Sequence, residues 1–135
     1  MIDTNAILCQ HLKTAGSGLY ALVGTRIYCP RVPAGFTNTA AALEVMRRTG
    51  TSKREHEMHE VSFQIKCFGG TNSHASAEAV YRALWDRIHG AEGVTVTDGF
   101  IIQAFEDVSG QSLFDPDSGW PYVLSFWTVT MRPTA

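Results

Sequence analysis

One segment, from about His74 to His89, carries a helical repeat of apolar residues that restricts the fold more than any other feature of the chain. Asn72 or Ser73 is suited to cap the start of this helix, and Gly90 is suited to end it. The repeat places six side chains on one broad face: Ala77, Val80, Tyr81, Leu84, Trp85 and Ile88. Strand-like sequences precede and follow the helix, so we expect this apolar face to lie on a β-sheet.

The segment before the helix is predicted to be a β-hairpin. An apolar residue stands at every second position from Val61 to Cys67, which is typical of a strand with one buried face. The preceding stretch 43–50, "LEVMRRTG", is compatible with helix or strand on propensity alone, and we assign it to the first arm of the hairpin. Because the stretch 49–60 is polar and mixed in charge, we expect it to form a long projecting loop.

Three further strands are predicted after the helix. The first two, "VTVT" at 94–97 and "FIIQAF" at 100–105, are joined by the turn-forming pair Asp98-Gly99. A loop rich in Asp, Ser, Gly and Pro is expected from Glu106 to Pro121. The last strand, "YVLSFWTVTMR", has large apolar residues on both of its faces, so both faces need a cover. One face can meet the predicted helix, and the other requires the N-terminal helix or a neighbouring subunit.

Together these elements predict an α+β fold. We expect a largely antiparallel sheet of four to five strands, with the main amphipathic helix packed on one face. A short N-terminal helix is predicted from Thr4 to about Lys13, with Asp3 as its cap. An apolar turn or short helix, a β-prone "RIYC" and a loop from Pro30 to Ala42 follow it. A chain of 135 residues without a repeat or linker is predicted to form a single domain, 1–135.

Composition narrows the classes of partner. The formal net charge of −2 argues against nucleic acid as the main partner, because phosphate binding needs an excess of Lys and Arg. No apolar stretch approaches the ~18 residues that span a bilayer, and the first residues lack the pattern of a signal peptide. Cys9, Cys29 and Cys67 are widely spaced, so we interpret them as reduced thiols. We therefore expect a soluble protein made in the cytoplasm, with no membrane partner.

The stretch "HEMHE" at 56–60 raises the question of a metal site. The zinc-protease motif needs His-Glu-x-x-His on a helix, whereas His56 and His59 are one residue closer and lie next to a predicted strand. If that strand extends back to residue 56, the two side chains point to opposite faces and cannot share an ion. A small metal-dependent enzyme that uses His56, His59 and nearby carboxylates stays open as an alternative.

Other sequence signatures of catalysis are absent from the chain. It has no phosphate-binding G-x-x-x-x-G-K-[ST], no G-x-G-x-x-G after a strand and no G-x-S-x-G. Asp115 and Asp117 in "DPDSG" match a calcium loop only in part, and a capped turn is the better interpretation. We therefore predict no enzymatic activity, no catalytic, cofactor-binding or metal-binding residue, and no cofactor.

Arg47, Arg48, Lys53 and Arg54 form the only basic cluster of the sequence, and three glutamates follow it closely. One interpretation is a solvated loop. The other is a charge-complementary contact with another subunit or with an acidic surface. Trp120, directly before the last strand, also has two interpretations: a core residue, or an anchor of the kind that is enriched at interface hot spots.

The order of segments along the chain is itself a pattern. A short N-terminal helix is followed by "LVGTRIYCPRVP", a stretch ending in "RRTG", a polar loop, "HEVSFQIKCFGG", the helix "ASAEAVYRALWDRI" and a terminal aromatic strand. "GTRIY" and the "V-x-F-x-I-x-C-F" before the alanine-rich helix are its most distinctive parts. In this order the chain resembles the tail-completion or tail-terminator proteins of long-tailed bacteriophages and prophages.

The resemblance implies a structural virion protein of the tail, made in the host cytoplasm. In that family an α+β subunit assembles as a ring, commonly a hexamer, that caps the tail tube and provides the surface for head–tail joining. The implied partners are further copies of the chain, the tail tube protein and the head connector or neck protein. A role as a head-completion or connector-joining neck protein is the alternative.

By position, the stretches 49–60 and 106–121 are the predicted contacts to neighbouring subunits or to the tube. The family implies no catalytic residue. The residues that we assign to the subunit or tail-tube interface are Arg47, Arg48, Lys53, Arg54, His56, His59, Phe114 and Trp120.

Overall fold

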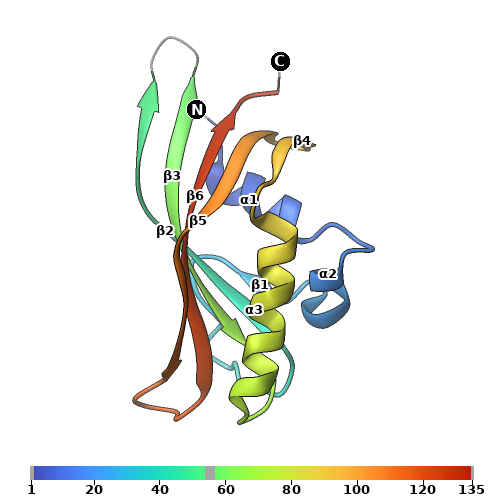
Figure 1. Ribbon diagram of the computed structural model, residues 1–135, viewed down its shortest axis with the longest axis vertical. Coiled ribbons are helices and arrows are strands. Elements are labelled where there is room, and N and C mark those ends of the chain that lie inside the picture. The colour runs from blue at the N-terminus through green and yellow to red at the C-terminus, as the bar shows by residue number, and fades with distance from the viewer. Residues whose placement is uncertain (1, 54–56, 135) are drawn as a thin grey trace.

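The computed structural model describes residues 2–53 and 57–134, and it confirms the predicted α+β class (Figure 1). The helices are α1 (Thr4–Leu12), α2 (Gly18–Val23) and α3 (His74–Ile88). The strands are β1 (Ile27–Tyr28), β2 (Ala42–Lys53), β3 (Met58–Phe68), β4 (Glu92–Val96), β5 (Gly99–Phe114) and β6 (Pro121–Arg132). Within the described ranges, no helix combines the length and the apolar character needed to cross a membrane.

The strands form one sheet in the order β1-β2-β3-β6-β5-β4. Neighbouring strands are antiparallel except for β1 and β2, which run parallel through the pairs Ile27–Leu43 and Tyr28–Glu44. The prediction of four to five strands was therefore too small, since the mixed sheet has six. One edge is β1, a strand of two residues that lies within the β-prone "RIYC" of the sequence.

All three helices lie on the same side of the sheet (Figure 1). The N-cap of α3 is as predicted, because Ser73 Oγ accepts a hydrogen bond from the backbone N–H of Ala75 at 3.1 Å. Trp85, which we predicted for the buried face, is 41% exposed and stacks on His89 instead. The apolar face of α3 is thus narrower than its sequence indicates. Its buried side chains are Ala77, Val80, Leu84 and Ile88.

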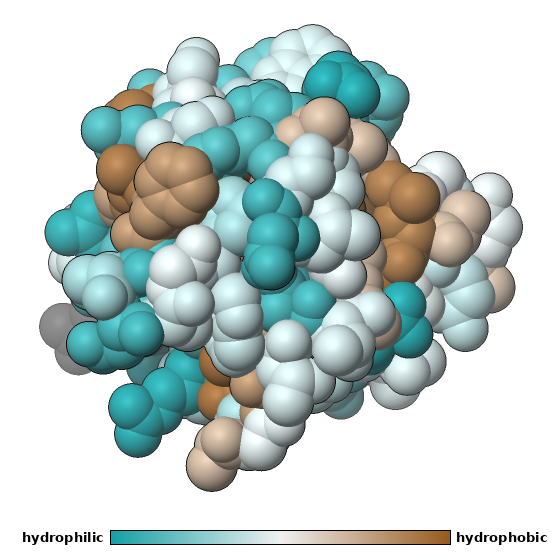
Figure 2. Space-filling view, turned by 90° about the horizontal axis from the view of Figure 1, so that it is seen from below, coloured by the Kyte–Doolittle hydropathy of each residue, from teal (hydrophilic) through white to brown (hydrophobic). Residues whose placement is uncertain are grey.

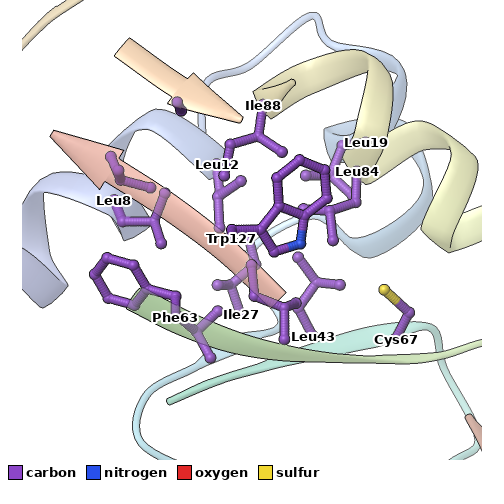
Figure 3. Close-up of a cluster of buried hydrophobic side chains, with 14 of the residues drawn as sticks. Leu8, Leu12, Leu19, Ile27, Leu43, Phe63, Cys67, Leu84, Ile88 and Trp127 are labelled. Carbon is purple, nitrogen blue, oxygen red and sulfur yellow. The ribbon is translucent and has the colours of Figure 1, made fainter. Parts of the chain in front are cut away.

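The core lies between the helices and the face of the sheet that they cover, which we call the covered face. Trp127 of β6 stands at its centre, with Leu12, Leu84 and Ile88 around it (Figure 3). The indole is fully buried, and its Nε1–H donates to Ser125 Oγ at 2.8 Å. Burial of a large apolar side chain contributes on the order of 2–3 kcal/mol, and the bonded N–H avoids the penalty of an unpaired buried donor.

Reciprocal hydrogen bonds between His11 and Arg87 tie α1 to α3. Arg87 Nε and Nη2 donate to the backbone carbonyl of His11 at 3.1 and 3.0 Å, and Nη2 also lies 3.2 Å from His11 Nδ1. Because a guanidinium only donates, Nδ1 is the acceptor, and the Nε2–H of a neutral ring donates to the Arg87 carbonyl at 3.1 Å. Burial, followed by the charge of Arg87, lowers the pKa of His11. A neutral imidazole is therefore part of the packing between these helices.

The two long stretches that we predicted to be loops belong largely to strands. In the stretch 49–60, β2 continues to Lys53 and β3 begins at Met58; in the stretch 106–121, β5 continues to Phe114 and β6 begins at Pro121. β5 remains paired with β6 despite its Asp, Ser and Gly content, because β-bulges shift its register and absorb the irregular residues. The resulting hairpins extend to opposite ends of the sheet, β2–β3 at the top and β5–β6 at the bottom of Figure 1.

Candidate interaction surfaces

The β2–β3 end of the sheet carries the predicted basic residues. Arg47 and Arg48 are both exposed. Arg47 reaches α1, where its Nη1 donates to Thr4 Oγ1 at 3.1 Å. Arg48 lies on the opposite face, with its guanidinium carbon 4.9 Å from the centre of the Phe126 ring. The predicted residues Arg54 and His56, and the side chain of Lys53, lie outside the described part of the chain.

His59 of β3 is nearly buried, at 8% exposure. It pairs with Met131 of β6, and its buried Nε2 meets no hydrogen-bond partner among the described residues. Beside it, a hollow of about 240 Å³ is lined by Thr4, Arg47 and residues of β2 and β3. Within 2–53 and 57–134, no three His, Cys, Asp or Glu side chains are grouped to hold a metal ion. His56, the other residue of the metal hypothesis, lies outside these ranges.

Asp115 holds the turn at the β5–β6 end. Its Oδ1 accepts hydrogen bonds from the backbone N–H groups of Asp117 at 2.8 Å and Ser118 at 3.1 Å, and its own N–H donates to the carbonyl of Trp120 at 2.9 Å. The bonds from Ser118 and Asp117 lower the pKa of the Asp115 carboxyl. These bonds confirm the capped turn that "DPDSG" predicts.

Phe114, the last residue of β5, is 63% exposed, more than any other large apolar side chain of the described residues. Its ring meets the edge of the His74 ring at a centroid distance of 4.5 Å, and His74 Nε2 lies 3.1 Å from the carbonyl oxygen of Leu113. Figure 2 views the molecule from this end and shows brown, apolar side chains in separate patches among teal and white ones. Phe114 is thus held in position without being buried.

Trp120 belongs to an aromatic cluster at the same end. Its ring centre lies 5.5 Å from that of Phe36 and 6.5 Å from that of Phe68, and Phe68 lies 5.8 Å from Tyr122. Trp120 remains half-buried, so it both supports this end and presents part of its ring to solvent. The contact with Phe36 could not be predicted from the sequence, because Phe36 comes from a distant stretch with no regular period.

The face of the sheet away from the helices, which we call the open face, is apolar at its centre. Tyr122, Leu124 and Phe126 of β6 are half-buried there, whereas the alternate residues of β6 are buried on the covered face. On the neighbouring β5, Phe105 and Val108 are 39% and 53% exposed. The sequence predicted that this second face of β6 needs the N-terminal helix or a neighbouring subunit. α1 does not supply the cover, because it lies on the other side (Figure 1).

Positive charges lie over the aromatic rings of the open face. Lys66 Nζ is 5.0 Å from the centre of the Tyr122 ring and 3.7 Å from Glu44 Oε1. Arg48 takes the corresponding place over Phe126. Such cation–π contacts contribute about 0.5–1 kcal/mol at exposed sites. The open face therefore combines an apolar centre with a charged border on its β2–β3 side.

Comparison with known families decides what kind of protein has these surfaces. Residues 7–130 match the profile of one family, described as tail completion protein gp17. The chain belongs to that family. The predicted resemblance is confirmed, and it places this tail-completion protein in the virion tail. Among curated proteins, none matches the sequence.

The fold of the tail-completion protein also occurs in a solved virion structure. A chain of the structure titled "Virion of native gene transfer agent (GTA) particle" superposes with a TM-score of 0.66 at 19% identity. The likeness covers 91% of this chain and 90% of that chain. At this level of identity, the likeness shows that the two chains share a fold.

The middle of β5 in the tail-completion protein is fixed by α3. The Tyr81 hydroxyl donates to Glu106 Oε2 at 2.5 Å and accepts from the backbone N–H of Gly110 at 2.9 Å. Burial, followed by the bond with Glu106, raises the pKa of Tyr81 to about 12. A side chain at position 110 would collide with the Tyr81 ring, so glycine is required where β5 approaches the helix. These contacts hold the bulged strand in place.

Two of the three cysteines of the tail-completion protein lie together, which their sequence spacing does not reveal. Cys9 of α1 and Cys29 line one hollow of about 380 Å³, and all three cysteines are free thiols, as predicted. Burial, followed by the neighbouring Cys29, raises the pKa of Cys9 to about 12, and burial also raises the pKa of Cys29. Thiols with raised pKa values remain protonated at neutral pH and are weak nucleophiles.

Proposed function

We propose that this tail-completion protein is a ring-forming structural subunit, with six copies in the ring, that caps the tail tube and provides the surface for head–tail joining. The observation that carries the proposal is the family match over residues 7–130. The tail tube protein, the head connector or neck protein and further copies of the chain are its partners in this role. The family consists of structural virion proteins, and we assign the chain a structural rather than a catalytic role.

The two ends of the sheet support this role. A subunit at the end of a tube needs contacts on two opposite sides, one toward the tube and one toward the head connector. Arg47 and Arg48 lie toward the β2–β3 end, and Phe114 and Trp120 lie at the β5–β6 end. The stretches 49–60 and 106–121 are therefore the contact regions of the proposal, and Lys53, Arg54, His56 and His59 belong to the first of them.

The first test is the mass of the purified protein by light scattering over a concentration series, with negative-stain images of any large species. A closed ring of about six subunits, formed alone or only after tail tubes are added, is the expected result. A protein that stays monomeric under every condition and does not bind tail tubes would contradict the proposal.

A pair of variants tests the β5–β6 end. Phe114→Ser removes an apolar side chain that is 63% exposed, and the matched control Leu22→Ser removes one that is 40% exposed on α2. Both variants should keep the thermal midpoint of the wild type within a few degrees, because little buried area is lost. Phe114→Ser should weaken ring formation or binding at the tube end, and Leu22→Ser should not. Equal behaviour of the two variants would exclude Phe114 from the contact.

Electron microscopy of particles that lack the protein separates the two virion roles. Over-long tails without heads are expected if the protein stops tube growth. Tails of normal length without heads would instead assign it to the neck, as a head-completion or connector-joining protein.

A further inference from the structure

Among the described residues, the sheet has two long edges without a partner strand. On one flank, β1 pairs with β2 only at Leu43 and Glu44, so no described strand pairs with the outer side of β2 over 45–53. On the other flank, the pairing of β4 with β5 ends at Gln103, and Ala104 still exchanges hydrogen bonds with Gly90 and Ala91. No described strand pairs with the outer side of β5 over 105–114, where side chains of α3 and its C-cap bond two single backbone groups: the N–H of Glu106 donates to His89 Nδ1 at 3.1 Å, and the N–H of Gly110 donates to the Tyr81 hydroxyl at 2.9 Å. Strand edges of this length that lack a partner strand are sites at which another chain can add.

These two edges belong to opposite flanks of one sheet, so they do not compete for the same partner. Strand order places β2 and β5 on either side of the central pair β3 and β6. A contact that joins one flank of a copy to the other flank of the next is heterologous, and a heterologous contact closes into a ring when its rotation allows. A contact between two identical flanks would stop at a dimer.

Charge favours the contact between unlike edges. β2 carries the exposed Arg47 and Arg48, while β5 carries the exposed Asp107 and the half-buried Glu106. Two β2 edges would therefore repel each other, as would two β5 edges, while a β2 edge and a β5 edge attract. The bulges at Arg47–Thr49 and within 106–111 disfavour pairing with an arbitrary regular strand.

We infer that copies of this chain join head to tail through these edges, with the outer edge of β2 in one copy lying against the outer edge of β5 in the next. The inference rests on the ring proposed above and names its interface. The partner at each edge is a second copy of the same chain, and the ring contains one closed band of strands to which each copy contributes β2, β3, β6 and β5.

The levels of the two edges fit a closed band. Across the sheet, Thr49 is in register with Ser62, Thr128 and Phe105. Thr49 is the middle of the β2 stretch 45–53, and Phe105 is the first residue of the β5 stretch 105–114. The middle of one stretch therefore lies at the same height in the sheet as the start of the other. The two stretches are therefore offset by about four residues, or roughly 13 Å at about 3.3 Å per residue. The four strands that each copy contributes are together roughly 19 Å wide, at about 4.8 Å per strand. An offset of this size over this width means that the strands are tilted by roughly 35° from the axis of the ring, as in closed barrels.

Charge reversal on each edge tests the inference. The β2-edge variant carries Arg47→Glu and Arg48→Glu, and the β5-edge variant carries Asp107→Lys and Gln111→Lys, at positions that are all exposed. Each variant alone should need a concentration roughly tenfold or more above that of the wild type for half-assembly. An equimolar mixture should recover rings of wild-type mass, because unlike edges attract again in an alternating order. Circular dichroism and the thermal midpoint verify that each variant is folded.

The outcomes are distinct for the interface and for the ring. If the wild type forms rings but either variant assembles equally well alone, or if the mixture of folded variants stays monomeric, the assigned edges are wrong while the ring stands. If the wild type forms no ring, even on added tail tubes, the ring proposal fails and this inference fails with it. Where rings form only on tubes, the same variants are compared by co-sedimentation with the tubes.

Cross-linking gives a second readout that does not depend on charge. If the two edges run antiparallel with this offset, the middle of the β2 stretch of one copy meets the middle of the β5 stretch of the next. In a double variant with Thr51→Cys and Ser109→Cys, we therefore expect the thiol introduced at position 51 of one copy to lie close to the thiol introduced at position 109 of its neighbour. A short bismaleimide should then produce a ladder from dimer to full ring in a denaturing gel. Each single variant serves as the control and should give no ladder. A double variant without a ladder, in preparations that contain rings, would overturn the assignment.

Discussion

The two faces of β6 have similar side chains and different surroundings. Val123, Trp127 and Val129 on the covered face are fully buried, whereas Leu124 and Phe126 on the open face keep part of their surface exposed. The helices of the described residues all lie on one side of the sheet (Figure 1). We therefore expect the stability of the subunit to depend on the covered face much more than on the open face.

Replacing Trp127 by alanine should have the largest effect, because it empties the centre of the core. Substitutions of this kind lower the free energy of unfolding by about 3–5 kcal/mol. Urea unfolding followed by circular dichroism measures the loss as a lower midpoint at an unchanged slope. A loss below about 1.5 kcal/mol, smaller than a typical large-to-small core substitution, would mean that the covered face does not dominate stability.

Thiol labelling compares the faces directly. Cys67 is completely buried on the covered face, and burial raises its pKa, whereas Leu124→Cys places a thiol on the open face. At pH 8, N-ethylmaleimide should modify the introduced thiol about 100-fold faster or more, because a buried protonated thiol is inert. Mass spectrometry of timed samples measures both rates. In urea the two thiols should react alike, and similar rates in the folded protein would remove the distinction between the faces.

Phe126→Ala tests the open face itself. The ring is half-buried and lies under Arg48, so its removal should lower the free energy of unfolding by about 1–2 kcal/mol, from lost area and the lost cation–π contact. The same urea experiment provides the value. A loss as large as that for Trp127→Ala would break the comparison, since it would make the open face an equal part of the core.

The smallest effect concerns the helix contact above the covered face. The pKa of His11 is lowered in the folded protein, so the unfolded chain binds this proton more readily. The contribution of neutral His11 is therefore complete above its ordinary pKa of 6.5 and is lost as the pH falls through the lower pKa of the folded state. The urea midpoint should therefore decrease between pH 8 and pH 5 by more for the wild type than for His11→Asn. An equal decrease for both proteins would contradict this role of His11.

Much of the covered face was predictable because its elements are regular. The repeat in α3, its Ser73 cap and the alternation from Val61 to Cys67 are local patterns, and the structure confirms them. His59 lies two residues before Val61, so its side chain points to the same face of β3 as that of Val61. This explains why the histidine is nearly buried. The turn at Asp115 was also local, and it forms as predicted.

The remaining features depend on contacts between distant segments or on broken periods. The continuation of β5 beyond Glu106 was missed because each bulge interrupts the period of two. The meeting of Phe36 with Trp120, and of Cys9 with Cys29, brings together residues from separate elements without any shared motif. For the open face, the sequence predicts only that a cover is needed, because β6 also has apolar residues at its alternate positions. It does not show which protein supplies that cover.

The arrangement of the two hairpins also determines how the subunit carries a mechanical load. Each hairpin contributes one strand to the central antiparallel pair, and the register joins β3 to β6 from His59–Met131 to Phe68–Tyr122. A pull that separates the β2–β3 tip from the β5–β6 tip draws these strands past each other along their length. The hydrogen bonds between them then share the force at the same time, as in shear, and are not broken one after another, as in peeling. If the two tips hold the tube and the head, tension between a filled head and its tail acts on the strongest direction of the sheet.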